Sequence, residues 1–79
     1  MLKYKKVFES NSIAKYEYYP EGDTKNTGLV AISKKTCEVT IIELSPKDSM
    51  KIYAMKISKK LRAFQKASEY KENGIIAWH

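Results

Sequence analysis

Cys37 and His79 are the residues whose types could carry nucleophilic catalysis in this chain. A cysteine nucleophile needs a base within hydrogen-bond reach and a third group that orients that base. Here the only histidine is the last residue, where chain ends tend to fray, and Cys37 falls in a turn-like stretch. One cysteine and one histidine also cannot fill a structural zinc site, which takes four such ligands. We therefore expect no catalytic residue and no metal site.

The carboxylates and glycines lead to the same expectation. Glu17, Glu38 and Glu43 could in principle supply the acid pair of a glycosidase. Acids on strand surfaces are more often solvated or paired with lysines of a neighbouring strand. None of the three glycines opens a helix, so no phosphate-binding loop is present. We expect a non-enzymatic protein with no cofactor and no small-molecule substrate.

Basic residues are concentrated in one segment of the sequence. Residues 1–46 hold seven lysines against six acids, whereas residues 47–72 hold eight basic residues against three acids. Within that segment the stretch KISKKLRAFQK, Lys56–Lys66, has five cations and no carboxylate: Lys56, Lys59, Lys60, Arg62 and Lys66. Charge concentrated in this way favours an acidic partner more than the same charge spread over the chain.

Three interpretations of these cations stay open. They could be a solvated helix face without a role, a surface for an acidic protein, or a surface that neutralises phosphates of nucleic acid. With only one arginine, bidentate base recognition is poorly provided for, so nucleic-acid binding would be independent of sequence. Adsorption to a membrane is not expected, because the apolar side of the same helix is needed to cover the sheet.

Tyrosines form the second conspicuous set. Alternation places Ala14, Tyr16 and Tyr18 on one side of a strand, and Lys15, Glu17 and Tyr19 on the other. Tyr16 and Tyr18 could be core or a partner surface, since tyrosine suits half-buried positions. Tyr19 is the better surface candidate because it shares its side with charged residues.

The spacing of apolar residues predicts the elements that position these side chains. We predict strands at about 4–10, 13–19, 29–33 and 39–44, a helix at about 46–70 and a strand at about 75–78. Ser45 is the expected N-cap, Pro46 the first helical residue and Asn73-Gly74 the stop. The helix face expected to be buried comprises Met50, Tyr53, Ala54, Ile57, Leu61 and Phe64.

These elements predict an α+β fold. A small, mostly antiparallel sheet in the order β-β-β-β-α-β is covered on one face by a single long amphipathic helix. The last strand is apolar enough for a central or well-covered position. Lys34-Lys35-Thr36-Cys37 indicates a hairpin turn; a tight turn there favours Gly or Asn with φ > 0, so we expect a small strain cost at Cys37.

From length and composition we expect one cytoplasmic domain over residues 1–79. The chain has the size of a single small domain, and its one cysteine fits a reducing compartment. No apolar run approaches the roughly 20 residues that a membrane span needs. The start MLKYKKVFES lacks the apolar core of a signal peptide.

Three stretches resemble a known group of proteins: KYEYYPEGDT (15–24), GLVAISKKTCEVTI (28–41) and GIIAWH (74–79). Together they resemble a family of small uncharacterised proteins encoded by bacteriophages and mobile elements of Firmicutes. That family has no established activity, so the resemblance implies no functional residues. It implies a bacterial or phage-infected cytoplasm, and a host or viral macromolecule as partner.

The leading hypothesis from the sequence is a binding module that contacts a host or viral protein or forms a homodimer. The alternative is a sequence-independent nucleic-acid-binding accessory protein that uses the basic helix face. The candidate partner-binding residues are Tyr19, Lys56, Lys59, Lys60, Arg62 and Lys66.

Overall fold

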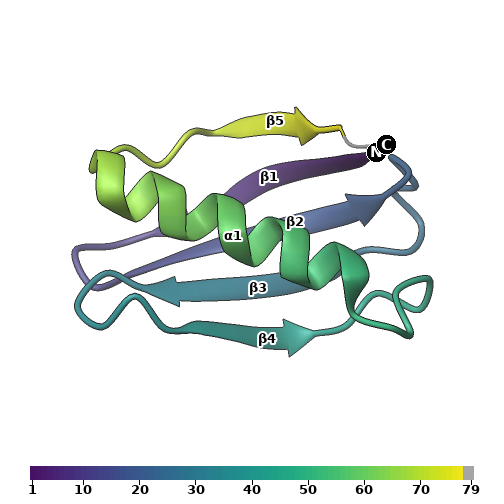
Figure 1. Cartoon of the computed structure of the whole chain (residues 1–79), viewed down its shortest axis with the longest axis horizontal. Coiled ribbons are helices and arrows are strands. Elements are labelled where there is room, and N and C mark those ends of the chain that lie inside the picture. The colour runs from purple at the N-terminus through teal and green to yellow at the C-terminus, as the bar shows by residue number, and fades with distance from the viewer. Residues whose placement is uncertain (78–79) are drawn as a thin grey trace.

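Five antiparallel strands and one helix form the fold, in the predicted order β-β-β-β-α-β (Figure 1). The computed structural model of the protein describes residues 1–77. The elements are β1 (Leu2–Glu9), β2 (Ile13–Pro20), β3 (Gly28–Ser33), β4 (Val39–Glu43), α1 (Ile52–Ala67) and β5 (Asn73–Ile76). The predicted α+β class is confirmed, and the bounds of the first four strands differ from the predicted bounds by at most two residues.

The strands lie in the order β4-β3-β2-β1-β5. Because three successive hairpins place β1 to β4 side by side, only the outer sides of β1 and β4 stay available to the last strand. β5 takes the outer side of β1, where Ile76 pairs with Leu2 and Asn73 with Lys5. β5 is therefore an edge strand, so of the two expected positions, central or well-covered, the central one is wrong. The strand also begins earlier than predicted, and Trp78 lies outside the described residues.

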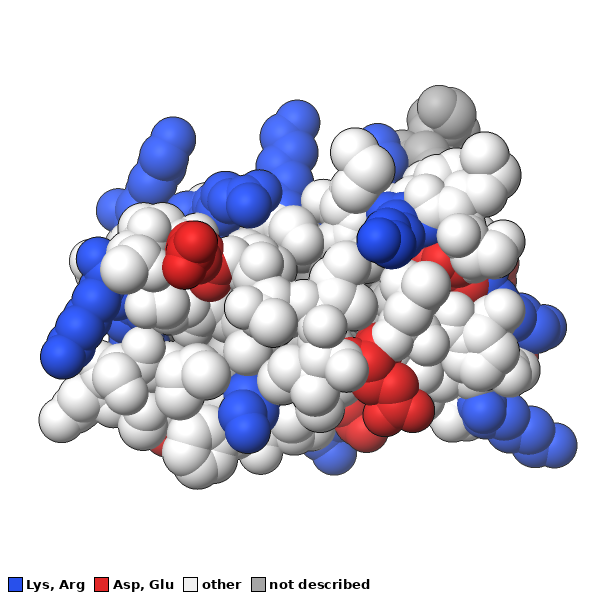
Figure 2. Space-filling view, turned by 90° about the horizontal axis from the view of Figure 1, so that it is seen from below, with Lys and Arg blue, Asp and Glu red and all other residues white. Residues whose placement is uncertain are grey.

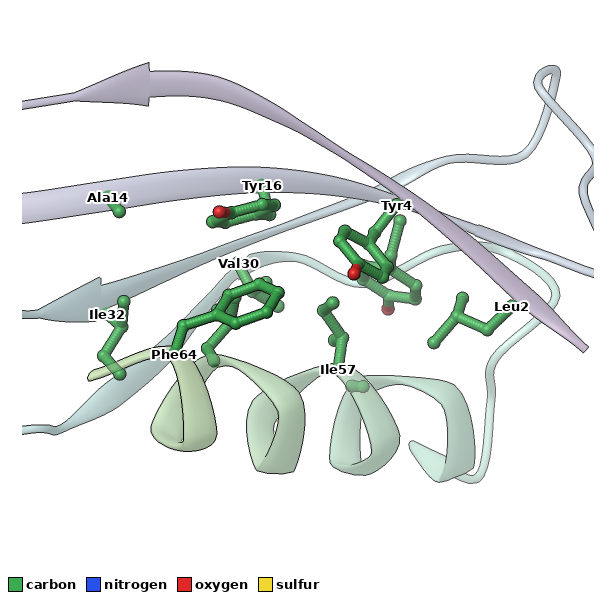
Figure 3. Packing of buried hydrophobic residues seen from close by; sticks show 11 residues of the cluster. Leu2, Tyr4, Ala14, Tyr16, Val30, Ile32, Ile57 and Phe64 are labelled. Atoms are coloured by element: carbon green, nitrogen blue, oxygen red, sulfur yellow. The ribbon is translucent and has the colours of Figure 1, made fainter. Parts of the chain in front are cut away.

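α1 packs on one face of the sheet, and alternate strand residues are buried beneath it (Figure 3). The core consists of Leu2, Tyr4, Ala14, Tyr16, Tyr18, Val30, Ile32, Ala54, Ile57, Leu61 and Phe64. Tyr16 and Tyr18 are fully buried, so the core interpretation of these two side chains is correct. The ring of Phe64 has its centroid 5.9 Å from the ring centroids of both Tyr4 and Tyr16. The helix therefore covers the sheet as the sequence predicted.

The helix begins six residues later than predicted, at Ile52 instead of Pro46. Ser45 does not cap it, because the Ser45 N–H donates to the Tyr18 hydroxyl (3.1 Å) and the Ser45 hydroxyl donates to the Asn26 carbonyl (2.6 Å). Lys51 then takes a left-handed conformation, φ 61°, which turns the chain into the helix. Met50 consequently lies outside α1 and is exposed, not buried.

The Asp48 carboxylate caps the helix from a distance in the sequence. It accepts hydrogen bonds from the N–H groups of Tyr53 (3.0 Å) and Ala54 (2.8 Å), and from the Tyr18 hydroxyl (3.2 Å). Its side chain is enclosed, with only 2% of the residue exposed. Asp48 thus satisfies two of the donors that a helix N-terminus leaves without intrahelical partners.

The helix ends three residues before the predicted bound of 70, at Ala67, where the apolar spacing weakens. Ser68 turns the chain at φ 54°, and the N–H of Glu69 donates to the Phe64 carbonyl (3.1 Å). The predicted stop Asn73-Gly74 lies instead within β5. Gly74 is needed there because a Cβ would stand 2.4 Å from the Tyr4 hydroxyl.

The predicted hairpin between β3 and β4 is present, and Cys37 has the expected positive φ of 63°. Its N–H donates to the Ser33 carbonyl (2.9 Å), which closes the turn. No helix of residues 1–77 is long and apolar enough to cross a membrane.

Candidate functional site

The five predicted cations lie on α1, and α1 carries no acidic residue. Three of the five, Lys59, Arg62 and Lys66, are exposed, and Lys56 and Lys60 are half-buried. Several Lys and Arg side chains stand out from the helix side of the molecule in Figure 2. We call Lys56, Lys59, Lys60, Arg62 and Lys66 the basic face.

Four residues of the basic face have no carboxylate partner among residues 1–77: Lys59, Lys60, Arg62 and Lys66. Lys60 instead makes a cation–π contact, in which its Nζ stands 5.8 Å from the centroid of the Phe64 ring. A surface with several uncompensated charges of one sign attracts ligands of the opposite sign.

Most acids are held by groups outside the basic face. Glu9 bridges Lys34 (2.5 Å) and Lys6 (2.6 Å), and these two bonds hold the pKa of the Glu9 carboxyl below its usual value. Lys6 also pairs with Glu72 at 3.1 Å. These pairs lie beside the C-terminal end of α1 and leave Lys59, Lys60, Arg62 and Lys66 without a carboxylate partner among residues 1–77.

Glu21 and Asp23 are likewise engaged elsewhere. Glu21 pairs with the N-terminal ammonium (2.7 Å) and accepts from the Tyr53 hydroxyl (2.8 Å). Asp23 accepts from Asn26 (2.7 Å) and from the Lys25 N–H, and it pairs with Lys47 (3.2 Å). In that order these contacts lower the pKa of the Asp23 carboxyl to about 2.

Tyr19 does not join the basic face. It pairs with Lys3 across the β1–β2 ladder, on the sheet face opposite α1. Its hydroxyl donates to Glu17 (2.8 Å), and burial followed by this bond raises the pKa of Tyr19 to about 12. With Lys3, Lys5 and residues of β5 it lines a hollow of about 570 Å³. The structure thus separates Tyr19 from the other five candidates by the thickness of the sheet.

A groove that the sequence did not predict runs between β4 and α1. Its volume is about 540 Å³, and we call it the β4–α1 groove. The residues that line it are Ile41, Met50, Lys51, Ala54, Met55, Ser58, Lys59 and Arg62. It therefore includes two members of the basic face, Lys59 and Arg62.

Apolar side chains of the groove are unusually exposed. Met50 is 78% exposed, Met55 is 69% exposed and Ile41 is 37% exposed. The one sequence signal for the exposure of Met55 is that it does not share the helical spacing of the buried residues Ile57 and Leu61. Methionines are common on surfaces that adapt to partners, because the unbranched side chain can repack. The groove thus combines an adaptable apolar lining with cations at its rim.

The residues considered for catalysis lie in a turn, on the sheet and outside the described residues. Cys37 is exposed in its hairpin turn, and His79 lies outside the described residues. Glu17 of β2 and Glu43 of β4 both pair with Leu29, so they lie two strands apart on the sheet face opposite α1, and Glu38 directly precedes β4. Among residues 1–77, no group of three or more His, Cys, Asp or Glu side chains could hold a metal ion.

Comparison of the chain with protein-family models, curated protein sequences and solved structures finds no match. The site must therefore be interpreted from its own geometry. That geometry defines a small α+β domain with a basic helix and an apolar groove at one edge of its sheet.

Proposed function

We propose that this chain is a non-enzymatic module that binds a partner protein through the β4–α1 groove. The observation that carries the proposal is the combination in that groove of exposed Met50 and Met55 with Lys51, Lys59 and Arg62. None of these three cations has a carboxylate partner within residues 1–77. The groove is therefore suited to a ligand that is both apolar and acidic.

A protein satisfies both requirements better than a nucleic acid does. Protein interfaces are enriched in Met and Arg and bury apolar side chains at their centre. Most nucleic-acid contacts go to phosphate and sugar, which would leave the exposed methionines without a partner. The mixed lining thus favours protein among the partners that the sequence left open.

The sign of the charge also favours a partner other than a second copy. Self-association through two facing grooves would bring Lys51, Lys59 and Arg62 of each copy against like charges, which costs free energy. An acidic partner protein would gain in both association rate and specificity from the same residues. A phage or mobile-element origin, and a host or viral partner, stay predictions from the resemblance.

Selection from a random peptide display library tests the proposal directly. We expect the immobilised protein to enrich peptides that combine acidic with aliphatic residues. Binding of the enriched peptides should fall at least tenfold in Arg62→Glu, which reverses a charge in the groove. Lys66→Glu is the matched control, because it makes the same change on α1 outside the groove. It should change binding less than threefold.

Two outcomes would overturn the proposal. One is the absence of any enriched peptide class. The other is equal loss of binding in Arg62→Glu and Lys66→Glu, which would indicate attraction to overall charge without a defined groove.

A second candidate function, nucleic-acid binding, is supported by the absence of acids from α1. The basic face could neutralise several phosphates and release counterions, so affinity would fall steeply with salt. A mobility-shift assay with mixed DNA and RNA at low salt is the most favourable condition for this function. No shift there would dismiss it. A shift that Lys59→Gln, Lys60→Gln and Lys66→Gln each weaken would support it.

A further inference from the structure

β4 is an edge strand with a free outer side. It pairs only with β3, so the backbone N–H and C=O groups on its outer side have no strand partner within residues 1–77. A row of such groups is a template on which another extended chain can pair. Recognition by strand addition uses this template, and pockets beside the edge then select side chains.

The β4–α1 groove lies directly beside this edge. Ile41 pairs with Val30, a core residue beneath α1, so Ile41 lies on the helix side of the sheet. Met55 and Arg62 of α1 form the opposite wall. A strand added to β4 would place alternate side chains between these walls, because successive strand residues point to opposite faces.

Charge complementarity identifies the kind of strand. Lys51, Lys59 and Arg62 line the groove, and the described chain gives none of them a carboxylate. Glu43 does not compensate them from β4, because it pairs with Leu29 on the opposite sheet face. The groove is therefore complementary in charge to acidic side chains on the helix side of an added strand.

The β4 ladder limits the length of regular pairing. Leu29 pairs with Glu43 and Val30 with Ile41, which leaves Ile42 as an extra, bulged residue. A bulge interrupts the ladder and bends its strand. Pairing of an added strand is therefore centred on Val39 to Ile41, and the ligand is a short extended segment.

We propose that β4 accepts an extended acidic segment of a partner protein as a sixth strand. An aliphatic side chain of that segment lies on Ile41 and Met55, and an acidic side chain two residues away lies by Arg62 and Lys59. This inference rests on the proposed function and adds the conformation and chemistry of the bound segment.

The other sheet edge also has cations beside an apolar residue, but no methionine: its hollow on the helix side is lined by Lys56, Lys59, Lys60, Ala63 and Ile76. β5 has four residues, and the hollow beside it on the open face is lined by Lys3, Lys5 and Tyr19. Its exposed apolar residue, Ile75, has no methionine beside it in that lining. β4 is therefore the edge to which we assign the segment.

The test uses an acetylated, amidated peptide whose central residues are glutamate-threonine-leucine-threonine-glutamate, placing leucine and both glutamates on one side of a strand. A second peptide has the same side chains but carries N-methyl groups on the backbone nitrogens of the two threonines. The methyl groups replace the N–H donors that would pair with one neighbouring strand. The measurements are affinity and amide hydrogen exchange of the full 79-residue protein.

We expect the unmethylated peptide to bind and to protect amides within Val39–Ile41 at least tenfold. N-methylation should weaken binding at least tenfold if the methylated donors face β4. The N–H groups of alternate residues point to opposite edges of a strand, and either edge of the peptide could face β4. A third peptide, N-methylated at the two glutamates and the leucine, therefore removes the donors of the other edge. One of the two methylated peptides should lose binding, and Met55→Glu should weaken the parent peptide at least tenfold.

Failure separates the two proposals. If display peptides bind through Arg62 but neither they nor the designed peptide protect β4 amides, strand addition is wrong and protein binding stands. Full binding by both methylated peptides would overturn strand addition in the same way. If the display selection enriches nothing, the proposed function itself fails.

Discussion

Replacing Asp48 by Ala should destabilise the protein more than any surface change on α1. The carboxylate accepts three hydrogen bonds, from the Tyr53 and Ala54 N–H groups and from the Tyr18 hydroxyl, at 2.8–3.2 Å. The substitution Asp48→Ala would leave these donors without the acceptor, in a site where Asp48 is only 2% exposed. Losing the acceptor should therefore raise the free energy of the folded state.

The magnitude follows from the size of each term. Loss of a helix N-cap costs about 0.5–2 kcal/mol, and a buried donor left unsatisfied costs about 1–3 kcal/mol. The three bonds share one carboxylate and are not additive, so we expect a loss of about 3 kcal/mol. A domain of this length has a total stability of about 4–12 kcal/mol. The melting temperature should fall by about 12–24 °C.

Thermal and urea unfolding followed by far-ultraviolet circular dichroism measure this loss. Asp48→Asn keeps one acceptor oxygen and should lose about half as much. Ser49→Ala is the matched control, because Ser49 is the exposed neighbour of Asp48 and its change should stay within about 0.5 kcal/mol. A loss below about 1 kcal/mol in Asp48→Ala would refute the reasoning, since the carboxylate would then not hold the helix start.

Three further predictions concern the packing and turns of the sheet. Gly28→Ala should cost at least about 2 kcal/mol, because its Cβ would stand 2.1 Å from the Tyr18 ring; unchanged urea unfolding would contradict this close packing. Cys37→Gly should raise the free energy of unfolding by about 0.5–1 kcal/mol, because glycine adopts the φ of 63° at Cys37 without strain. The control Cys37→Ala should change it by less than about 0.5 kcal/mol, and a lower melting temperature in the glycine variant would contradict the strain. Burial raises the pKa of Tyr18 to about 12, and burial also raises the pKa of Tyr16 above its usual value. Because these folded-state pKa values exceed the unfolded value near 10, stability should be complete below about pH 10 and fall as pH rises towards 12, and a flat pH profile of unfolding would contradict it.

The sheet and its covering helix could be predicted because their signals are local. Alternation in β2 separates Ala14, Tyr16 and Tyr18 from Lys15 and Glu17, and the structure buries the first three residues in the core. The 3-4-3 spacing of the central helix residues likewise gives its buried face. These periodicities depend only on the geometry of a strand or a helix.

The helix start could not be predicted, because a tertiary contact decides it. Ser45-Pro46 is typical of an N-cap and first helical residue. In the folded protein the Tyr18 hydroxyl, 27 positions away along the chain, accepts the Ser45 N–H. Asp48 then caps a helix that begins at Ile52. The local sequence preference therefore correctly indicated that a helix begins in this region, but it placed the start at Pro46 instead of Ile52.

The candidate site was predictable only in its charges. The five cations are visible in the sequence, but the lack of carboxylate partners at Lys59, Lys60, Arg62 and Lys66 among residues 1–77 depends on where the acids fold. The groove depends on strand order, because β4 must be an edge for its outer side to be open. For Tyr19, strand alternation predicted a surface position. It could not show that this surface is the sheet face opposite α1, away from the basic face.

The late helix start links the stability of the fold to the proposed binding site. If α1 began at Pro46, Met50 would lie on the buried helix face and Lys51 would be an ordinary helical residue. Because Asp48 caps a helix that starts at Ile52, Met50 and Lys51 lie in the segment before the helix, where they line the β4–α1 groove. The same carboxylate that stabilises the helix therefore defines one end of the surface that we assign to the partner. A variant such as Asp48→Asn should weaken peptide binding as well as stability, whereas a core variant such as Leu61→Ala should lower stability while the folded fraction keeps its affinity.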